Sequence, residues 1–267
     1  MLPDIEQVTR IIEETSAQEA VPRFRALAMA DIKRKASGDL VTAADLAVEH
    51  RLEQRLRDLL PGTVAVGEEA VEANQGLIEA VTRAGRVWVI DPIDGTGNFA
   101  AGNPLFAVMV SLIEDGITLA GWIHDPIGAR SAVASRGDGA LMNGRRLQVA
   151  PGAHPLAMRG ALHASTYAPP ELAAQINRRR GKVGAIKSLH CAGQEYLRLA
   201  GGETHFAFYS RLLPWDHAAG VLIHREAGGI GRTLAGDDYE ARDFRQKGLL
   251  LAPDEASWGA LYGTLFE

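Results

Sequence analysis

The N-terminal part of the chain carries apolar side chains at helical spacing. In the opening segment they lie at positions 5, 8, 11 and 12, which predicts an amphipathic helix. Pro22 lies within its continuation towards residue 30 and is expected to kink it. Residues 31–39 are polar and predict a mobile loop. Thr42 is placed to cap a second helix, which Pro61 and Gly62 would end.

The middle of the chain changes to apolar runs of strand length. The expected strands are residues 64–66, 87–90, 105–113, 117–124, 131–134 and 146–149. Asp115-Gly116 and Asn143-Gly144 are turn signals between such runs. Because short turns join neighbouring strands as hairpins, this region predicts a largely antiparallel sheet.

Beyond residue 150 the two patterns alternate. Strands are expected at residues 160–164, 182–186, 205–209 and 248–251, and helices at 171–179, 192–200, 215–227 and the C-terminus. This alternation favours helices layered on sheet, an α/β (α+β layered) fold. The sequence contains no internal repeat and no low-complexity linker. We therefore expect a single domain over residues 1–267, with sub-halves of about 1–150 and about 151–267.

Composition narrows the class of protein. Of the 267 residues, 46% are apolar and 23% are charged, as in ordinary globular proteins with a full core. The net charge of −5 argues against a nucleic-acid partner, and no apolar run is long enough for a membrane span. Cys191 is the single cysteine, and Met1–Glu6 lacks the pattern of a signal peptide. We expect a cytoplasmic protein.

Residues 87–99, Val-Trp-Val-Ile-Asp-Pro-Ile-Asp-Gly-Thr-Gly-Asn-Phe, join a predicted buried strand to a candidate site. The strand delivers Asp91 and Asp94 to its carboxyl end, where α/β proteins commonly bind ligands. Gly95 allows close approach to the backbone, and Thr96 is expected to cap a short helix whose free N–H groups face the bend. Carboxylates for a hard cation beside donors for an anion suit a metal-bound phosphate.

Other carboxylates also end predicted strands or begin predicted helices. The full set is Asp45, Glu68, Asp91, Asp94 and Asp216. If these residues converge, their repulsion requires divalent cations, and an oxygen-only set favours Mg²⁺, or Mn²⁺, over a softer metal. In a two-metal site one ion activates water and the other stabilises a leaving oxygen. Taken singly, Asp45 and Asp216 are also explained as ordinary first-turn residues, and Glu68 as part of a surface pair.

Several motifs resemble the inositol monophosphatase family. Asp91-Pro-Ile-Asp-Gly-Thr-Gly-Asn-Phe99 is similar to its first signature, and Trp215-Asp-His-Ala-Ala-Gly220 to its second. Segments 39–45, 67–69, 137–144 and 226–229 also follow the family's order and spacing. The resemblance implies an αβαβα sandwich of the inositol monophosphatase and fructose-1,6-bisphosphatase type. It also implies a homodimer and magnesium-dependent hydrolysis of a small phosphate monoester.

The resemblance assigns a ligand set to two or three magnesium ions per site. Glu68, Asp91 and the backbone carbonyl of Ile93 are implied as ligands of the first metal. Asp91, Asp94 and Asp216 are implied as ligands of the second.

The resemblance also assigns catalytic and binding roles. Besides the ligand Glu68, Thr96 and Asp45 are similar to the pair that orients and helps deprotonate the attacking water. The N–H groups of Gly95 and Thr96 would hold the phosphate. Lys35 lies near the place of the family's mobile-loop lysine, although the basic run 33–35 is also explained as a solvated face.

Departures from the family pattern fall where the alcohol part of the substrate would bind. Tyr209 stands where members acting on inositol phosphate commonly carry a glutamate. His190-Cys-Ala192 stands in place of a Gly-Thr-Ala-like stretch. His190, Ala192, Tyr209 and Arg211 are therefore candidate specificity residues. Arg211 and His190 could bind a second anionic group, or could be a solvated arginine and a packed histidine.

Inositol phosphate is the expected substrate, and other small phosphates stay open: histidinol phosphate, a sugar phosphate or bisphosphate, and adenosine 3′,5′-bisphosphate. A haloacid-dehalogenase fold is disfavoured, because its motif places two aspartates two apart whereas Asp91 and Asp94 are three apart. A non-catalytic regulatory relative is disfavoured, because no metal ligand or water-activating residue is lost.

Overall fold

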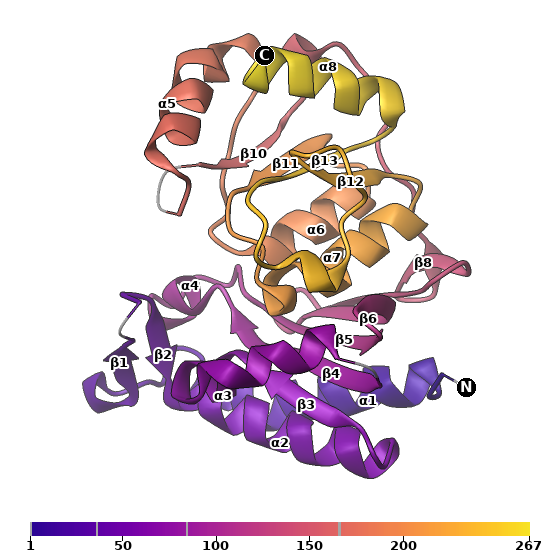
Figure 1. The fold of residues 1–267 in the computed structure, drawn as a ribbon. Coiled ribbons are helices and arrows are strands. Elements are labelled where there is room, and N and C mark those ends of the chain that lie inside the picture. Colours follow the sequence, from indigo (N-terminus) through magenta and orange to yellow (C-terminus); the bar gives the residue numbers. More distant parts are fainter. Residues whose placement is uncertain (1, 36, 84, 165–166) are drawn as a thin grey trace.

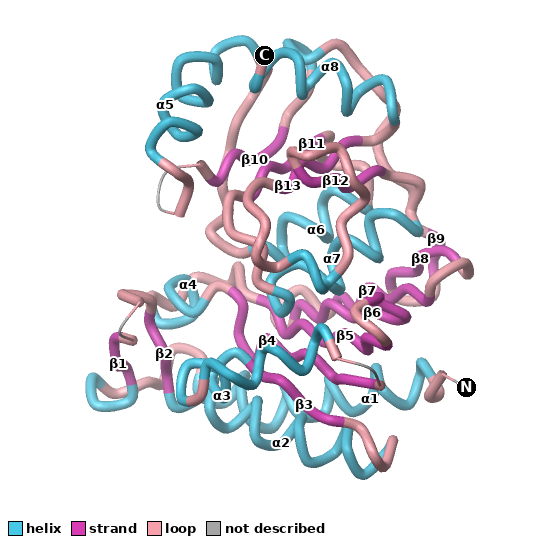
Figure 2. Tube along the Cα trace, in the orientation of Figure 1, coloured by secondary structure: helices cyan, strands magenta, loops and turns pink. Residues whose placement is uncertain are grey.

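Helices and sheets alternate as layers in the structure, a computed structural model that describes residues 2–35, 37–83, 85–164 and 167–267 (Figure 1). Helices α1 (Ile5–Thr15) and α2 (Ala43–Leu59) cover one face of a seven-stranded sheet. Helices α6 (Ala192–Ala200) and α7 (Pro214–Glu226) lie between that sheet and a four-stranded sheet (Figure 2). Helices α5 (Pro170–Arg179) and α8 (Glu255–Phe266) cover the far face. The predicted αβαβα sandwich is confirmed.

The larger sheet has the strand order β3-β4-β5-β6-β7-β8-β9. Its strands are β3 (Val64–Gly67), β4 (Arg86–Asp94), β5 (Ala107–Glu114), β6 (Ile117–Asp125), β7 (Arg130–Ser135), β8 (Gly139–Met142) and β9 (Arg145–Arg146). Only β3 and β4 pair in parallel, so the expected antiparallel character is confirmed. The strand expected at 146–149 is reduced to the two residues of β9.

The smaller sheet has the order β10-β11-β13-β12. Its strands are β10 (Gly160–His163), β11 (Phe206–Tyr209), β12 (Ile230–Thr233) and β13 (Leu249–Ala252). The sequence did not indicate β12, because Gly231 and Arg232 break its short apolar run. The strand expected at 182–186 is wrong: Arg180–Lys182 forms a 3₁₀ turn, and Ile186 makes one isolated bridge to Gly160.

The region between α1 and α2 differs most from expectation. Helical structure continues through Ser16–Ala20 and Val21–Arg23 and then stops, so the helix does not reach residue 30. The expected loop at 31–39 is partly a hairpin, in which β1 (Ile32–Arg34) pairs antiparallel with β2 (Leu40–Thr42). Position 36 of that loop lies outside the described residues. The pairing places Lys33 and Arg34, which have little strand tendency of their own, opposite Val41 and Leu40.

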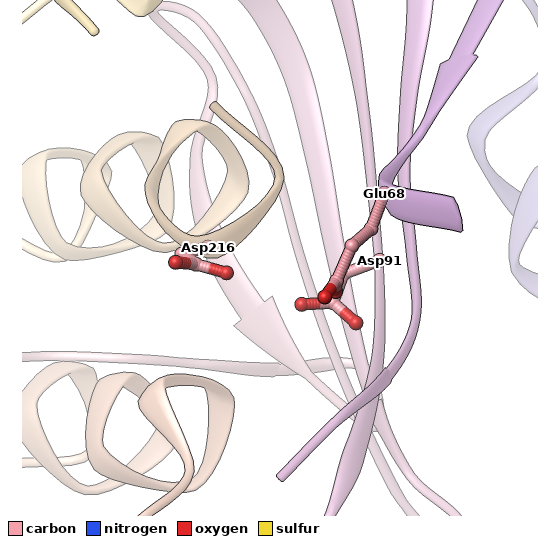
Figure 3. A group of neighbouring side chains, drawn as sticks. All are labelled: Glu68, Asp91 and Asp216. Carbon is pink, nitrogen blue, oxygen red and sulfur yellow. The ribbon is translucent and has the colours of Figure 1, made fainter. Parts of the chain in front are cut away.

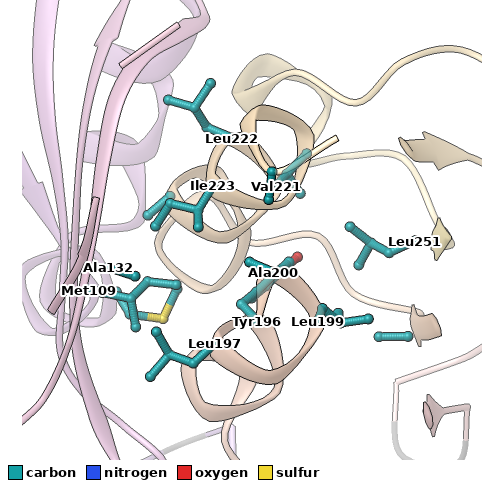
Figure 4. Close-up of a cluster of buried hydrophobic side chains, with 14 of the residues drawn as sticks. Met109, Ala132, Tyr196, Leu197, Leu199, Ala200, Val221, Leu222, Ile223 and Leu251 are labelled. Carbon is teal, nitrogen blue, oxygen red and sulfur yellow. The ribbon is translucent and has the colours of Figure 1, made fainter. Parts of the chain in front are cut away.

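The core between the larger sheet and the central helices is tightly packed. Figure 4 shows Met109 of β5 and Ala132 of β7 facing Leu197 of α6, within one buried cluster. A side chain at Gly121 of β6 would approach the Cα of Ala219 to 2.7 Å, so α7 packs directly on the sheet backbone.

The remaining helical elements are α3 (Glu68–Ala73), α4 (Thr96–Ala100) and short turns at 29–31, 75–82, 155–157 and 241–243. Among the described residues, no helix is both long and apolar enough to cross a membrane.

Candidate active site

Three carboxylates from separate elements meet beside the end of β4 (Figure 3). Glu68 opens α3, Asp91 lies in β4, and Asp216 lies in the first turn of α7. One oxygen atom of each lies within 4.8 Å of the other two. The fold therefore brings together three predicted metal ligands that are far apart in the sequence.

A β-bulge explains how one strand presents two aspartates to the same cavity. Asp91 pairs with Met109 of β5 and Asp94 pairs with Ala107. Between these two pairs β4 advances by three residues and β5 by only two, so β4 contains one extra residue. Because side chains alternate along a regular strand, the extra residue turns Asp94 to the side of Asp91. Both line the same cavity. The strand predicted to stop at Ile90 thus continues through the bulge.

Asp94 is held from the opposite direction by the start of α6. Its Oδ2 accepts the backbone N–H of Gly193 at 2.5 Å and the thiol of Cys191 at 3.0 Å. Asp94 is not a member of the group formed by Glu68, Asp91 and Asp216. Asp94 lies on the wall of the same cavity as those three residues.

The turn after β4 depends on a glycine. Gly95 has φ +84°, and a Cβ there would lie 3.0 Å from the Cβ of Cys191 and 3.1 Å from the carbonyl oxygen of Leu105. A larger residue would therefore be both strained and crowded. Gly95 is the N-cap of α4 and Thr96 is its first residue, so the predicted cap at Thr96 is displaced by one position.

Asp45 and Thr96 form a hydrogen-bonded pair beside this turn. The Thr96 hydroxyl lies 3.1 Å from Asp45 Oδ1 and 2.9 Å from the carbonyl oxygen of Ile93. Asp45 Oδ2 accepts both the N–H and the hydroxyl of Thr42, so the carboxylate also caps α2. Burial, with help from nearby Glu68, raises the pKa of Asp45 to about 6. The helix-cap and site explanations for Asp45 are therefore compatible.

The electrostatics of the cluster formed by Glu68, Asp91 and Asp216 fit a hard divalent cation. Asp91 Oδ1 is buried and has no hydrogen-bond partner among the described residues, which is costly for a carboxylate. Burial and the neighbouring Glu68, Asp94 and Asp216 raise the pKa of Asp91 well above its ordinary value. Burial raises the pKa of Asp216 to about 8, although Arg211 opposes the shift. An ion bound by these oxygens would relieve their repulsion.

Lys35 is part of the site's border and not a solvated residue. Its Nζ lies 2.6 Å from Glu68 Oε1 and 2.7 Å from Glu69 Oε1, with the side chain only 3% exposed. Burial alone would lower the pKa of Lys35, but the two carboxylates outweigh it and raise the pKa. Lys33 and Arg34 are exposed. The solvated-face explanation is therefore right for those two residues and wrong for Lys35.

The cavity above the carboxylates has a volume of about 450 Å³. All four candidate specificity residues line it: His190, Ala192, Tyr209 and Arg211. The sequence interpretation missed His163 and Tyr167, which line the same wall, and Glu195 behind them. A carboxylate on the apolar face of the predicted helix 192–200 was the available signal for Glu195. Nothing local marks His163, because its partner lies on another element.

The chain is similar to known proteins over nearly its whole length. The model of the inositol monophosphatase family matches residues 4–265. The Nus factor SuhB of Pseudomonas aeruginosa is 33% identical, with 91% of this chain and 89% of that protein covered. An inositol-1-monophosphatase of Mesorhizobium japonicum is 32% identical, covering 86% and 84%. A solved structure, the extragenic suppressor protein suhB of Bartonella henselae, has a TM-score of 0.82 and 25% identity, with 98% of each chain covered.

The layered fold and its acidic cavity define a class of phosphatase with a site that could hold a metal. Within that class, the chain belongs to the inositol monophosphatase family. The predicted family and its class of enzyme, a phosphoric monoester hydrolase, are confirmed. The haloacid-dehalogenase alternative is thereby rejected.

Proposed function

We propose that this chain hydrolyses a small phosphate monoester with the help of Mg²⁺, and that inositol phosphate is the first substrate to test. The observation that carries this proposal is the group of Glu68, Asp91 and Asp216 with its unpartnered buried oxygen. The similarity to a protein named inositol-1-monophosphatase supports the choice of substrate. The other phosphate esters considered from the sequence are not favoured by these similarities.

Metal ligands are proposed for two positions. Glu68, Asp91 and the carbonyl of Ile93 would hold one ion, and Asp91, Asp94 and Asp216 a second. The proposal is for two or three Mg²⁺ ions per site, with Mn²⁺ as a substitute. When bound, the ions supply positive charge that lowers the pKa of water and stabilises negative charge on the leaving oxygen.

The chain's own contribution is to orient the water and accept its proton. The Thr96 hydroxyl donates to Asp45 Oδ1, which leaves its oxygen free to accept a hydrogen bond from the attacking water. With a pKa of about 6, Asp45 is mainly ionised at neutral pH and can take up the proton through Thr96. The water oxygen bonds to phosphorus, and the bond from phosphorus to the alcohol oxygen breaks. That oxygen takes up a proton from solvent, and Asp45 later releases to solvent the proton that it accepted, so the protons balance. The N–H groups of Gly95 and Thr96 would orient the phosphate.

The test is release of inorganic phosphate from a panel of small monoesters, measured with Mg²⁺ and again with a chelator. The panel contains inositol 1-phosphate, histidinol phosphate, sugar phosphates and adenosine 3′,5′-bisphosphate. Release that requires Mg²⁺ supports the proposal. A folded protein that releases phosphate from no member of the panel would refute it.

A non-catalytic regulatory role is the second candidate, because a relative named Nus factor is as similar as the named phosphatase. The two roles differ in wild-type turnover, which a non-catalytic protein lacks, and Asp94→Asn tests whether that turnover depends on this site. Under the proposed function this change removes magnesium-dependent phosphate release while the fold, followed by circular dichroism, survives. Unchanged turnover in this variant would contradict the assignment of Asp94.

Lys35 is proposed as a positioning residue for Glu68, because its ammonium group fixes one oxygen of that carboxylate. The resemblance also leads us to propose a homodimer, which light scattering coupled to size-exclusion chromatography would detect. A cytoplasmic location is proposed from the single, buried Cys191. Fractionation of cells that express the chain would test the location.

A further inference from the structure

The cavity wall facing the carboxylate group carries hydrogen-bond donors and positive charge. It is formed by His163 at the end of β10, Tyr167, and Tyr209 and Arg211 at and after the end of β11. In an enzyme that holds the scissile phosphate beside Glu68, Asp91 and Asp216, this wall faces the alcohol part of the substrate. Its chemistry therefore bears on which alcohols can bind.

His163 is held in one orientation by a buried carboxylate. Its Nε2 lies 3.0 and 2.8 Å from the two oxygens of Glu195, and its ring stacks on Tyr209 with centroids 5.1 Å apart. Although burial opposes it, the contact with Glu195 raises the pKa of His163 above its ordinary value. Nδ1 has no hydrogen-bond partner within the described part of the chain. Nδ1 is therefore free to contact a bound group, and it donates a hydrogen bond whenever the ring is protonated.

Arg211 is also fixed, yet its donors are not exhausted. Its guanidinium group stacks on the ring of Tyr167 at 3.8 Å from the centroid. The ion pairs with Asp39 and Asp216 are long, at 3.5 and 3.9 Å. A guanidinium group offers five N–H donors, so these contacts leave capacity for a bound anion.

The carboxylates of this wall are already engaged. Glu195 accepts from the Tyr209 hydroxyl and the Leu189 N–H, both at 2.8 Å, in addition to His163. Asp39 accepts from the Tyr167 hydroxyl at 2.7 Å and pairs with Arg211. The wall therefore offers donors to the substrate and has little acceptor capacity for the hydroxyl groups of a polyol. Tyr209, which stands where family members acting on inositol phosphate commonly carry a glutamate, also removes a carboxylate acceptor from this wall.

We propose that His163 and Arg211 bind a second anionic group on the alcohol part of the substrate. The preferred substrates are then phosphate monoesters whose leaving alcohol carries a carboxylate or a further phosphate. This inference rests on the proposed function, because it assumes that the scissile phosphate lies at the carboxylate group. His163 and Arg211 are specificity-determining residues in this proposal.

The test compares substrates that differ only in the second anion, with Mg²⁺ present. Suitable pairs are adenosine 3′,5′-bisphosphate with adenosine 3′-phosphate, inositol 1,4-bisphosphate with inositol 1-phosphate, and 3-phosphoglycerate with glycerol 3-phosphate. We expect kcat/KM to favour the anionic member of at least one pair by about tenfold, the usual strength of a charge-assisted hydrogen bond.

Two variants locate the preference on the wall. His163→Gln keeps a donor for Glu195 but removes the ring and its free Nδ1, and Arg211→Gln removes the guanidinium group. Each is expected to reduce the ratio of kcat/KM values within the preferred pair towards one. Arg178→Gln is the control, because Arg178 is exposed on α5, outside the cavity, and its loss should leave the ratio unchanged.

The outcomes separate this inference from the function on which it rests. Phosphate release with equal kcat/KM values in every pair would overturn the inference alone. A preference that survives both His163→Gln and Arg211→Gln would also overturn it. Failure to release phosphate from any compound, including an aryl phosphate, would overturn the proposed function and this inference with it.

Discussion

Burying Asp91 in this site has a cost in folding free energy. One oxygen of its carboxylate has no partner among the described residues, and burial together with four neighbouring carboxylates raises its pKa. Such a group destabilises the metal-free protein whenever it is ionised. A cation that binds the folded chain would offset this cost and stabilise the fold.

Replacing Asp91 by asparagine should therefore separate stability from metal binding. In a chelator, Asp91→Asn is expected to raise Tm by roughly 2–4 °C, because repulsion among the carboxylates is relieved. Added Mg²⁺ should raise Tm of the wild type but not of the variant. Asp58→Asn, at an exposed position on α2, is the control. A variant less stable than wild type in chelator would contradict the proposed repulsion.

Thr96 tests the proposed proton path. Thr96→Val removes the hydroxyl that links water to Asp45 and should lower kcat by about 10²-fold or more. Thr96→Ser keeps the hydroxyl and should retain most of the activity. Because Thr96 does not supply a side-chain metal ligand, titration with Mg²⁺ should give similar affinities for both variants. A valine variant within about threefold of wild-type kcat would exclude this role.

The site residues that could be predicted from the sequence are those that lie together in one short stretch. Asp91, Asp94, Gly95 and Thr96 lie in one short stretch, so their residue types and spacing sufficed to place them at one cavity. His163 was missed because its significance comes from Glu195, which lies on another element. Contacts of that kind have no signature in either segment alone.

At the scale of elements, the bulged β4 and the turn that follows it determine the geometry. Gly95→Ala places a Cβ at positive φ and 3.0 Å from Cys191, so the free energy of unfolding should fall by about 1–2 kcal/mol. The turn should also shift and lower kcat/KM. Gly97→Ala is the matched control, because no atom lies within 4 Å of its added Cβ in α4. Equal stability of the two variants in denaturant titrations would contradict this view of the turn.

Helix α3, which presents Glu68, is anchored by a second buried carboxylate. Glu49 of α2 accepts the N–H groups of Glu69 and Ala70, both at 2.8 Å. Burial raises the pKa of Glu49 from 4.5 to about 7 despite these bonds. The folded state therefore holds this proton more tightly than the unfolded state does.

The sign of the resulting pH dependence follows from linkage. The stability that comes from protonated Glu49 is fully present below about pH 4.5 and is lost as pH rises to about 7. In chelator, the free energy of unfolding of wild type relative to Glu49→Gln should fall by about 1–3 kcal/mol between pH 5 and pH 8. Glu53→Gln, on a more exposed position of the same helix, should show no such trend. A difference that does not change with pH would show that Glu49 is ionised throughout.

Elements with strong periodicity could be predicted, and those that depend on distant pairing could not. The helices α2, α6 and α7 follow from their apolar spacing and end signals. The hairpin of β1 and β2 was mistaken for a loop, because Lys33 and Arg34 of β1 gain strand structure only by pairing with β2. Burial of Lys35 was missed for the same reason, since Glu68 and Glu69 lie on another element.

At the scale of the whole molecule, the layered architecture brings the site residues together from different elements. The larger sheet supplies Asp91, the helix that follows β3 supplies Glu68, and α7 carries Asp216 across from the layer between the two sheets (Figures 1 and 3). The proposed metal ligands thus come from different layers, while the wall of His163 and Arg211 lies at one end of the smaller sheet, because His163 ends β10 and Arg211 follows β11. Reaction chemistry and substrate choice are therefore assigned to different parts of one fold.

Magnesium-dependent phosphate release by wild type and Asp91→Asn, measured side by side on the best substrate of the panel, tests the proposed metal site most directly. Wild type is expected to gain activity with Mg²⁺ and lose it in chelator. The asparagine variant should stay folded and release no phosphate at any Mg²⁺ concentration. Wild-type turnover by a folded Asp91→Asn protein would contradict the assignment of this carboxylate group as the catalytic metal site.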